Sequence, residues 1–398
     1  MQDSSAISAT ISDDEKEHLQ ECDGLKALDL CGCISSVFVQ GLEELVREQF
    51  EDRIQSDGSL LPSPVTLPTL KRLGLRGVTS LSAATLTPLV LACTSLTHLD
   101  LSGTRCTPDL LASLADASTV RLTALALARC PRLTSESITE FLIDGFPARS
   151  LTQLSLYGDL TFKSCITETD LARIVTEAPC FTSGALEYLD LSSCAVTPVT
   201  LSSMSAQPAL RSLGLSFIPD LPLPFISSFL KTIASNVEII TLVSTSPELD
   251  FTLPNRRLPL ALHSFIQPLT AMPFRFSTTP ADVPVAMPPT KLRVVELGVV
   301  ALNSLGAGGD SWRIIRSKGG RGWYVHTSSG WENGRLRRDL PAGHPIRAEF
   351  EKLADSNGNV SSGVGWHARK MEVSCYFWSS FPDADRFLLR RCCKGEAC

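Results

Sequence analysis

Aliphatic residues recur along this chain in a six-residue pattern, L-x-x-L-x-L, in which mostly polar or small residues fill the spacer positions. The pattern begins at Leu25, Leu70, Leu96, Leu122, Leu151, Leu186 and Leu210, with aliphatic variants at Val237 and Leu292. Most successive starts are 24 to 29 residues apart, and intervals of 45, 35 and 55 residues mark longer units. The last two leucines of each hexad alternate with one spacer, which predicts a short strand with both leucines on one side.

A strand this short does not fold alone, so its repetition predicts that neighbouring strands stack side by side around one shared core. Periods of about 20–29 residues are typical of leucine-rich repeats. We therefore predict an α/β fold, a leucine-rich-repeat solenoid or horseshoe, over residues 20–304. Its parallel sheet would form the concave side and its helices the convex side.

Helix-start signals lie between the hexads. A hydroxyl residue precedes a helix-like segment at Thr107, Thr134 and Thr197, and proline follows directly at the first and third of these sites. The hydroxyl caps free amides of the first turn, and proline suits the first helical position. Apolar residues at a helical period predict one further convex helix over residues 34–55.

Residues 244–290 interrupt the repeats and contain nine prolines, too many for regular structure apart from a short helix around Leu260–Leu269. The segment is interpreted as an insertion that is either flexible or a lid beside the concave face. Proline-rich segments usually link or stay disordered, which favours the flexible insertion.

The composition changes after the last hexad. All five tryptophans lie within residues 305–380, where the runs WRIIRS, GWYVHTS and HARKMEVS alternate as strands do. One interpretation is a small β-rich C-terminal cap, because an end repeat exposes its core unless something covers it. The alternative is a module that binds nucleic acid or a phospho-ligand, since arginines are interleaved with the tryptophans. A cysteine-containing tail, residues 381–398, ends the chain.

Cysteines occupy recurrent places in the repeat. Cys33, Cys130 and Cys194 follow the last leucine of a hexad by three residues, while Cys22 and Cys93 precede the first leucine by three. A small side chain at the first place can face backbone groups of adjacent turns, so we expect reduced, buried thiols. In these features and in the phrase LALARCPRLTSESITEFL, the chain resembles the cysteine-containing, ribonuclease-inhibitor-like repeats of F-box proteins, the substrate-recognition subunits of cullin-type ubiquitin ligases.

The resemblance covers roughly residues 20–300 and implies a protein-interaction scaffold that recognises substrates for an SCF-type ubiquitin ligase, with a ligase adaptor among its partners. The F-box itself is not found. Only about 20 residues precede the first hexad, fewer than a small helical module needs. We interpret residues 1–19 as an acidic tail.

No motif for catalysis or for a bound cofactor is found. The glycine runs GAGGD and KGGRG do not follow the order of phosphate-binding loops, and no G-x-S-x-G sequence occurs. The C-terminal histidines and cysteines lack the paired spacing of a zinc site. We therefore expect neither enzyme activity nor a cofactor or metal.

Charge is unevenly distributed behind a net value of −6. Residues 1–60 hold 14 acidic and 4 basic side chains, whereas residues 311–398 hold 15 basic and 9 acidic ones. Because the C-terminal region is basic, nucleic acid is a second, less favoured candidate partner. The start of the chain is acidic and no apolar stretch reaches the ~18 residues of a membrane helix, so we expect a cytoplasmic or nuclear protein without a membrane partner.

Spacer side chains of the hexads, and those just after them, should face away from the leucine core toward a partner. The residues expected to bind another protein on this concave face are Arg72, Arg76, His98, Asp100, Gln153, Tyr157, Tyr188 and Asp190. Tyr157 and Tyr188 are the expected anchors, because aromatic residues beside charges are typical of interface hot spots. The simpler alternative is that these side chains only solvate the sheet.

Overall fold

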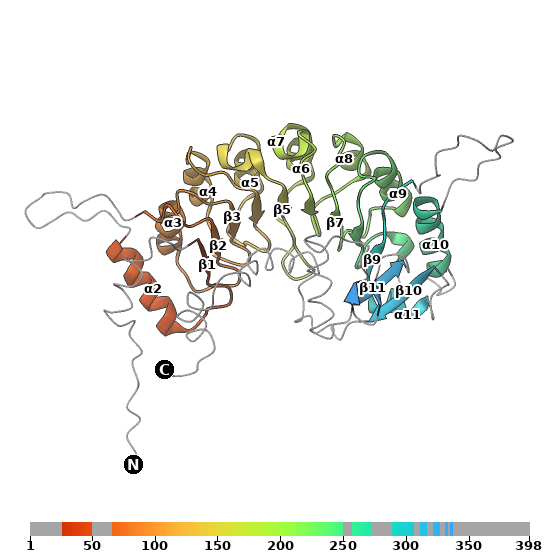
Figure 1. Ribbon diagram of the computed structural model, residues 1–398, viewed down its shortest axis with the longest axis horizontal. Coiled ribbons are helices and arrows are strands. Elements are labelled where there is room, and N and C mark those ends of the chain that lie inside the picture. Colours follow the sequence, from red (N-terminus) through yellow and green to blue (C-terminus); the bar gives the residue numbers. More distant parts are fainter. Residues whose placement is uncertain are drawn as a thin grey trace, which may run out of the picture. The chain divides into compact units, whose positions relative to one another are not determined.

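The computed structural model describes residues 26–49, 66–249, 257–271, 289–305, 311–316, 321–326, 331–332 and 335–336. These residues belong to two compact units, of which the first ends at Ser150 and the second begins at Leu151. In both units, parallel strands alternate along the chain with helices (Figure 1). The protein is thus α/β with mostly parallel sheets, an arrangement compatible with a solenoid.

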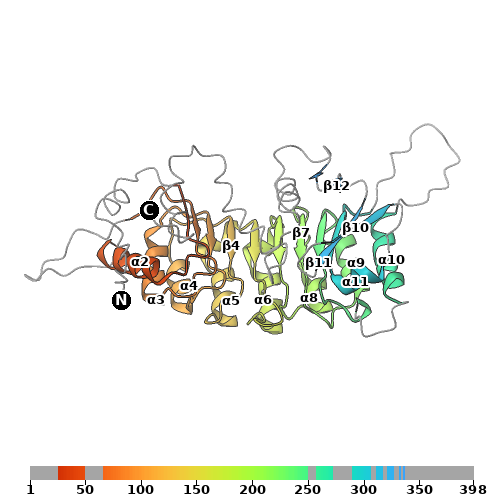
Figure 2. The same cartoon turned by 90° about the horizontal axis from the view of Figure 1, so that it is seen from below.

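The first unit contains four strands that pair in parallel and in chain order. They are β1 (Ala27–Asp29), β2 (Arg72–Gly74), β3 (His98–Asp100) and β4 (Ala124–Ala126). The helices are α2 (Ser36–Gln49), α3 (Ala83–Ala92), α4 (Pro108–Ala115) and α5 (Ser135–Ile143), followed by a short 3-10 helix, Phe146–Ser150. Helix α4 contacts both α3 and α5, so the helices of this unit form a row (Figure 2).

The second unit repeats this plan with five parallel strands and closes it with two antiparallel ones. The strands are β5 (Gln153–Ser155), β6 (Tyr188–Asp190), β7 (Ser212–Gly214), β8 (Ile239–Thr241), β9 (Val294–Gly298), β10 (Trp312–Arg316) and β11 (Arg321–His326). The helices are α6 (Glu168–Glu177), α7 (Pro179–Thr182), α8 (Pro198–Ser203), α9 (Leu223–Thr232), α10 (Arg257–Thr270) and α11 (Val299–Ser304), with a 3-10 turn at Pro247–Leu249. A separate pair joins β12 (Trp331–Glu332) to β13 (Arg335–Leu336).

Each of the nine hexads supplies one strand, as predicted. The central residue of every three-residue strand is an aliphatic side chain, and Leu73, Leu154 and Leu189 are typical in being fully buried. Its neighbours along the strand lie on the opposite side of the sheet because side chains alternate. The hexad therefore determines both the position of the strand and the side that faces the core.

The predicted helix starts are also confirmed. Thr107 and Thr197 directly precede α4 and α8, and proline occupies the first helical position in both. The predicted hydroxyl cap forms at Thr197, which accepts from the amide of Thr200, but the side chain of Thr107 makes no such bond. Thr134 forms a reciprocal capping box with Ser137 at the start of α5, with both backbone-to-side-chain distances at 3.2 Å. Such caps satisfy amides that would otherwise lack partners.

Helix α10 lies within the proline-rich segment and extends beyond the short helix expected there. Leu258, Leu262 and Phe265 are buried on it, and it contacts α9. In chain order, α10 therefore follows β8 and precedes β9, as α9 follows β7 and precedes β8. The long interval before Leu292 is thus one strand–helix unit with longer connections. The flexible insertion and the lid were predicted for residues 244–290, of which 250–256 and 272–288 lie outside the described ranges.

The two described strand runs after the last hexad are confirmed as β10 and β11; the run HARKMEVS lies outside the described residues. Strand β11 pairs antiparallel with β9, and β10 with β11. Trp312 and Trp323 are nearly buried, and Trp312 stacks on Tyr324 at a centroid distance of 5.1 Å. The hairpin therefore extends the sheet past β9 with large side chains.

Cysteines tie neighbouring repeats together as the spacing predicted. The thiol of Cys130 donates to the carbonyl oxygen of Leu101 at 3.1 Å, and that of Cys194 approaches the carbonyl oxygen of Leu156 at 3.6 Å. Thr245 occupies the same repeat position and donates to the carbonyl oxygen of Leu215. Each bond joins the turn of one repeat to the strand end of the preceding one.

One cysteine departs from the expectation of reduced thiols. Cys33 is disulfide-bonded, whereas Cys31, Cys93, Cys130 and Cys194 are free. Burial raises the pKa of the Cys93 and Cys130 thiols to about 12, which keeps both protonated at neutral pH. Spacing along a sequence identifies the repeat position of a cysteine but not which sulfur atoms meet in space.

Replacing Gly214 by alanine should destabilise the second unit. A Cβ atom at this position would lie 2.2 Å from Oδ1 and 2.5 Å from Cγ of the buried Asp190. Because the interior cannot move freely, we expect a loss of about 1–3 kcal/mol in the free energy of unfolding, measured with urea. Gly298→Ala is the control, since its Cβ would meet Val243 at an ordinary 3.9 Å. Equal stability of the two variants would contradict the packing of Asp190 over β7.

Candidate functional site

The candidate site is the side of each sheet that faces away from the leucine core, here called the strand-side surface. Strand pairing places its residues in rows, with Arg72 beside His98 in the first unit and Gln153 beside Tyr188 in the second. Each unit has a further row of residues just after its strands, which includes Arg76 in the first unit and Tyr157 in the second. The two units are treated separately below.

Arg72, Arg76 and His98 lie half-exposed on the strand-side surface of the first unit, as expected. The hydroxyl of Thr97 lies 2.9 Å from Nδ1 of His98. Partial burial, and secondly the charge of Arg72, lower the pKa of His98 from 6.5 to about 4. His98 is therefore neutral at physiological pH, and the positive charge of this row belongs to the arginines.

Asp100 belongs to the same surface but is buried, at 3% exposure, contrary to its expected contact with a partner. Its Oδ1 accepts a hydrogen bond from the backbone amide of Ser102 at 2.9 Å, whereas Oδ2 is buried without a hydrogen-bond partner. Burial raises the pKa of this carboxyl group, and the bonds to Ser102 and the charge of Arg76 oppose that shift. Asp29 makes the equivalent turn, accepting from the amide of Cys31 at 3.0 Å, and is half-exposed.

The strand-side surface of the second unit is largely buried, which corrects the expected anchors. Tyr157, Tyr188 and Asp190 have exposures of 2%, 0% and 0%, and Gln153 alone of the predicted residues in this unit is half-exposed. Asp190 Oδ1 accepts from the amide of Ser192 at 3.0 Å, and the Tyr188 hydroxyl approaches Asp190 Oδ2 at 3.5 Å. These side chains are part of the interior.

The burial continues across the sheet. Ser212, Thr241, Glu296 and Trp323, on neighbouring strands of the same unit, are all at most 5% exposed. Alternation along a strand determines the side of the sheet on which a side chain lies. It does not determine whether that side is covered, and for this reason Tyr157 and Tyr188 were wrongly expected to be accessible.

A left-handed turn, missed in the sequence, follows most strands. The second residue after the last hexad aliphatic residue has positive φ in seven of the described repeats. It is Gly32, Gly77, Gly103, Arg129, Ser193, Phe217 or Ser244. Its backbone amide donates to the carbonyl of the next repeat, as from Gly77 to Ser102 and from Gly103 to Ala128, both at 2.8 Å.

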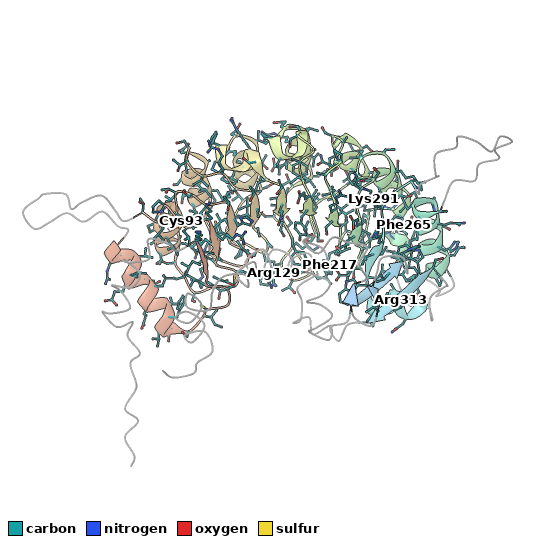
Figure 3. The ribbon with its side chains drawn as sticks, in the orientation of Figure 1. Cys93, Arg129, Phe217, Phe265, Lys291 and Arg313 are labelled. Carbon is teal, nitrogen blue, oxygen red and sulfur yellow. The ribbon has the colours of Figure 1, made fainter. Side chains whose placement is uncertain are left out.

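Arg129 and Phe217 are the unusual members of this series. Glycine adopts positive φ at little cost, whereas a large side chain there is strained. Arg129 lies on the side away from α4 and α5, and Phe217 on the side away from α8 and α9 (Figure 3). The Phe217 ring meets that of Tyr157 edge-on at a centroid distance of 6.5 Å. Aligning the repeats on their hexads would have shown glycine replaced at this position. Backbone strain of this kind is often retained where a side chain has a function.

No group of three or more histidine, cysteine or acidic side chains in the described ranges is placed to hold a metal ion. None of the helices within those ranges combines the length and apolar character that a bilayer crossing requires. Comparison with protein-family models and with curated proteins finds no match for this chain. The candidate site is therefore defined by its geometry alone.

Replacing Asp100 by asparagine should stabilise the protein at neutral pH. The amide keeps the acceptor used by Ser102 and removes a buried charge, so we expect a gain of about 1 kcal/mol in the free energy of unfolding. Because the folded-state pKa is raised, the gain should shrink as the pH falls toward 3.8. Asp29→Asn is the control, since the same turn is half-exposed there. Destabilisation by Asp100→Asn would show that the charge itself is needed.

His98 should make the fold less stable in mild acid. The unfolded chain takes up this proton near pH 6.5 and the folded chain only near pH 4. The neutral imidazole of His98 therefore contributes about 1–3 kcal/mol to the free energy of unfolding above pH 6.5. This contribution is lost as the pH falls to about 4. The free energy of unfolding, measured with urea at several pH values across this range, should change less with pH for His98→Gln than for the wild type. His263→Gln, exposed on α10, should retain the wild-type slope; identical slopes for all three proteins would refute the assignment.

Proposed function

We propose that this chain is a leucine-rich-repeat interaction protein that binds another protein through the strand-side surface of its first unit. The repeat type is supported by the hexad spacing, by the strand–turn–helix unit and by the cysteine and threonine donors that join successive repeats. Solenoids of this class use such surfaces for binding because the core needs only the leucine side of each strand.

The observation that carries the proposal is the pairing of Arg72 with His98. These residues are register partners on β2 and β3, face away from the buried Leu73 and Leu99, and are both half-exposed. The equivalent row of the second unit contains the fully buried Tyr188 and Ser212. A partner that approaches the strand side therefore meets accessible polar side chains on the first unit.

The role in a ubiquitin ligase that the resemblance implies stays a prediction. Substrate recognition requires a surface that binds protein and a second segment that binds the ligase adaptor. The strand-side surface of the first unit could supply the former. Adaptor subunits among the proteins recovered in the purification described below would support this role.

Binding of nucleic acid or a phospho-ligand through the C-terminal region also stays a prediction, and Trp312 and Trp323 offer it little support. Both side chains are at most 7% exposed, whereas base stacking needs an accessible aromatic face. Arg313 is half-exposed, and its Nε and Nη2 atoms are buried. The other arginine side chains of that region and those of Trp331, Trp366 and Trp378 lie outside the part that the structure describes.

The proposal is tested by affinity purification and mass spectrometry with the wild type and with Arg72→Glu combined with His98→Glu. A partner bound at this surface should be depleted at least tenfold, because a like charge or a lost charged hydrogen bond at an interface costs about 1.4 kcal/mol or more. Thermal unfolding of the variant confirms that it is folded.

The matched control is Arg173→Glu combined with Lys231→Glu, which changes exposed helix residues of the second unit. It should recover the wild-type set of partners. If both double variants recover the same partners as the wild type, the strand-side surface of the first unit is not the binding site.

A further inference from the structure

Four arginines gather in the loops that follow the strands of the first unit. The loops comprise residues 30–35, 75–82, 101–107 and 127–134, and they contain no aspartate or glutamate. Their charged residues are Arg76, Arg105, Arg129 and Arg132, here called the arginine edge. The matching loops of the second unit, residues 156–167, 191–197, 215–222 and 242–246, contain one lysine, two aspartates and no arginine.

Acidic residues of the first unit lie mainly on its helices. The helical ones are Glu43, Glu44, Glu48, Asp109, Glu136 and Glu140. Asp109 and Glu136, in the first turns of α4 and α5, are nearest in sequence to the arginine edge. Asp29 and Asp100, on the strands, are bonded to backbone amides. Charge is thus segregated, with the post-strand loops exclusively basic.

The arginine edge is continuous in space. The amide of Gly77 donates to Ser102 and that of Gly103 donates to Ala128, so the loops after β2, β3 and β4 lie side by side. Adjacent strands are about 4.8 Å apart, so the edge spans about 10 Å, the length of about three residues of extended chain. Arg105 and Arg132 are exposed, and Arg76 and Arg129 are half-exposed.

Arg129 is held at the edge in a strained backbone conformation. Its φ is 56°, at the turn position that the three preceding repeats fill with glycine. Glycine would relax the backbone at this turn, so it is the side chain of Arg129, and not the backbone conformation, that accounts for the arginine. Its presence at the turn, on the side away from α4 and α5 (Figure 3), is consistent with a need for the guanidinium group.

We propose that the arginine edge binds an acidic, carboxylate-rich segment of the partner protein in extended conformation. This inference rests on the proposed function and adds the chemistry of the partner. Guanidinium groups form paired hydrogen bonds with carboxylates, and arginines spread over three loops match carboxylates spaced along a chain. A single phosphate would need donors that converge on one point.

Nucleic acid fits this surface less well. The four loops contain no aromatic side chain on which a base could stack. In residues 26–49 and 66–150, ten lysines and arginines are balanced by ten aspartates and glutamates, whereas nucleic-acid-binding domains carry a net positive charge. An extended acidic segment instead contacts the edge alone and avoids the acidic helices.

The test is fluorescence anisotropy of the full chain with a short glutamate-rich peptide, a singly phosphorylated neutral peptide and a single-stranded RNA. The glutamate-rich peptide should bind most tightly, and its affinity should fall as salt rises. Arg129→Gly should weaken that binding on the order of three- to tenfold, since one charge-assisted contact is lost. Arg129→Lys should give an intermediate loss, because lysine keeps the charge but not the paired geometry.

Ser244→Gly is the matched control, because Ser244 has φ of 52° at the same turn position of the second unit. Ser244→Gly should unfold at the wild-type temperature or above it and should bind the peptide as the wild type does. Tighter binding of the phosphopeptide or RNA would overturn the proposal. An Arg129→Gly protein that binds normally but unfolds earlier would show that Arg129 is structural.

Failure of this inference is distinguishable from failure of the proposed function. If purified partners are lost with the Arg72 and His98 variants while the glutamate-rich peptide does not bind, the surface is an interface but the acidic partner is excluded. If partners are unaffected by those variants and the peptide still binds through Arg129, the edge is a site separate from the proposed surface.

Discussion

Burial of one aliphatic side chain per strand is the constraint on which the rest of this protein depends. Strands β1 to β8 are only three residues long, and the central aliphatic side chain of each is buried, as Leu73 and Leu189 are. A shift of one residue would turn that side chain away from the core and bring charged spacers into it. The repetition of the hexad therefore determines which side chains are available for any other purpose.

Joining successive repeats requires a second set of interactions at the turns. Positive φ after the strand lets the chain leave the sheet, and the turn amides donate to the next repeat, as from Ser193 to Ser216. Cys130, Cys194 and Thr245 then donate to the strand end of the preceding repeat. Because backbone groups leave the sheet at this point, their satisfaction by neighbouring repeats keeps the turns ordered.

The two units have the same arrangement of parallel strands but differ in the exposure of the strand-side surface. In the second unit the strand-side surface is largely buried, and the carboxyl group of Asp190 accepts a hydrogen bond from a turn amide. In the first unit, the half-exposed Arg72 and His98 lie on the strands and the exposed Arg105 and Arg132 lie in the loops. Recognition is therefore proposed for the unit whose polar side chains are accessible, and the acidic partner follows from the segregation of its charges.

The sequence alone determined the nine strands, the starts of α4, α5 and α8, and the side of the sheet to which Arg72 and His98 belong. These features depend on local spacing and on the alternation of side chains, which a single chain records directly. Only the tertiary structure decided that Tyr157, Tyr188, Asp100 and Asp190 are buried, that α10 packs beside α9 and that Cys33 is disulfide-bonded. Coverage of a surface and the meeting of two sulfur atoms depend on residues distant in sequence, and no local pattern encodes them.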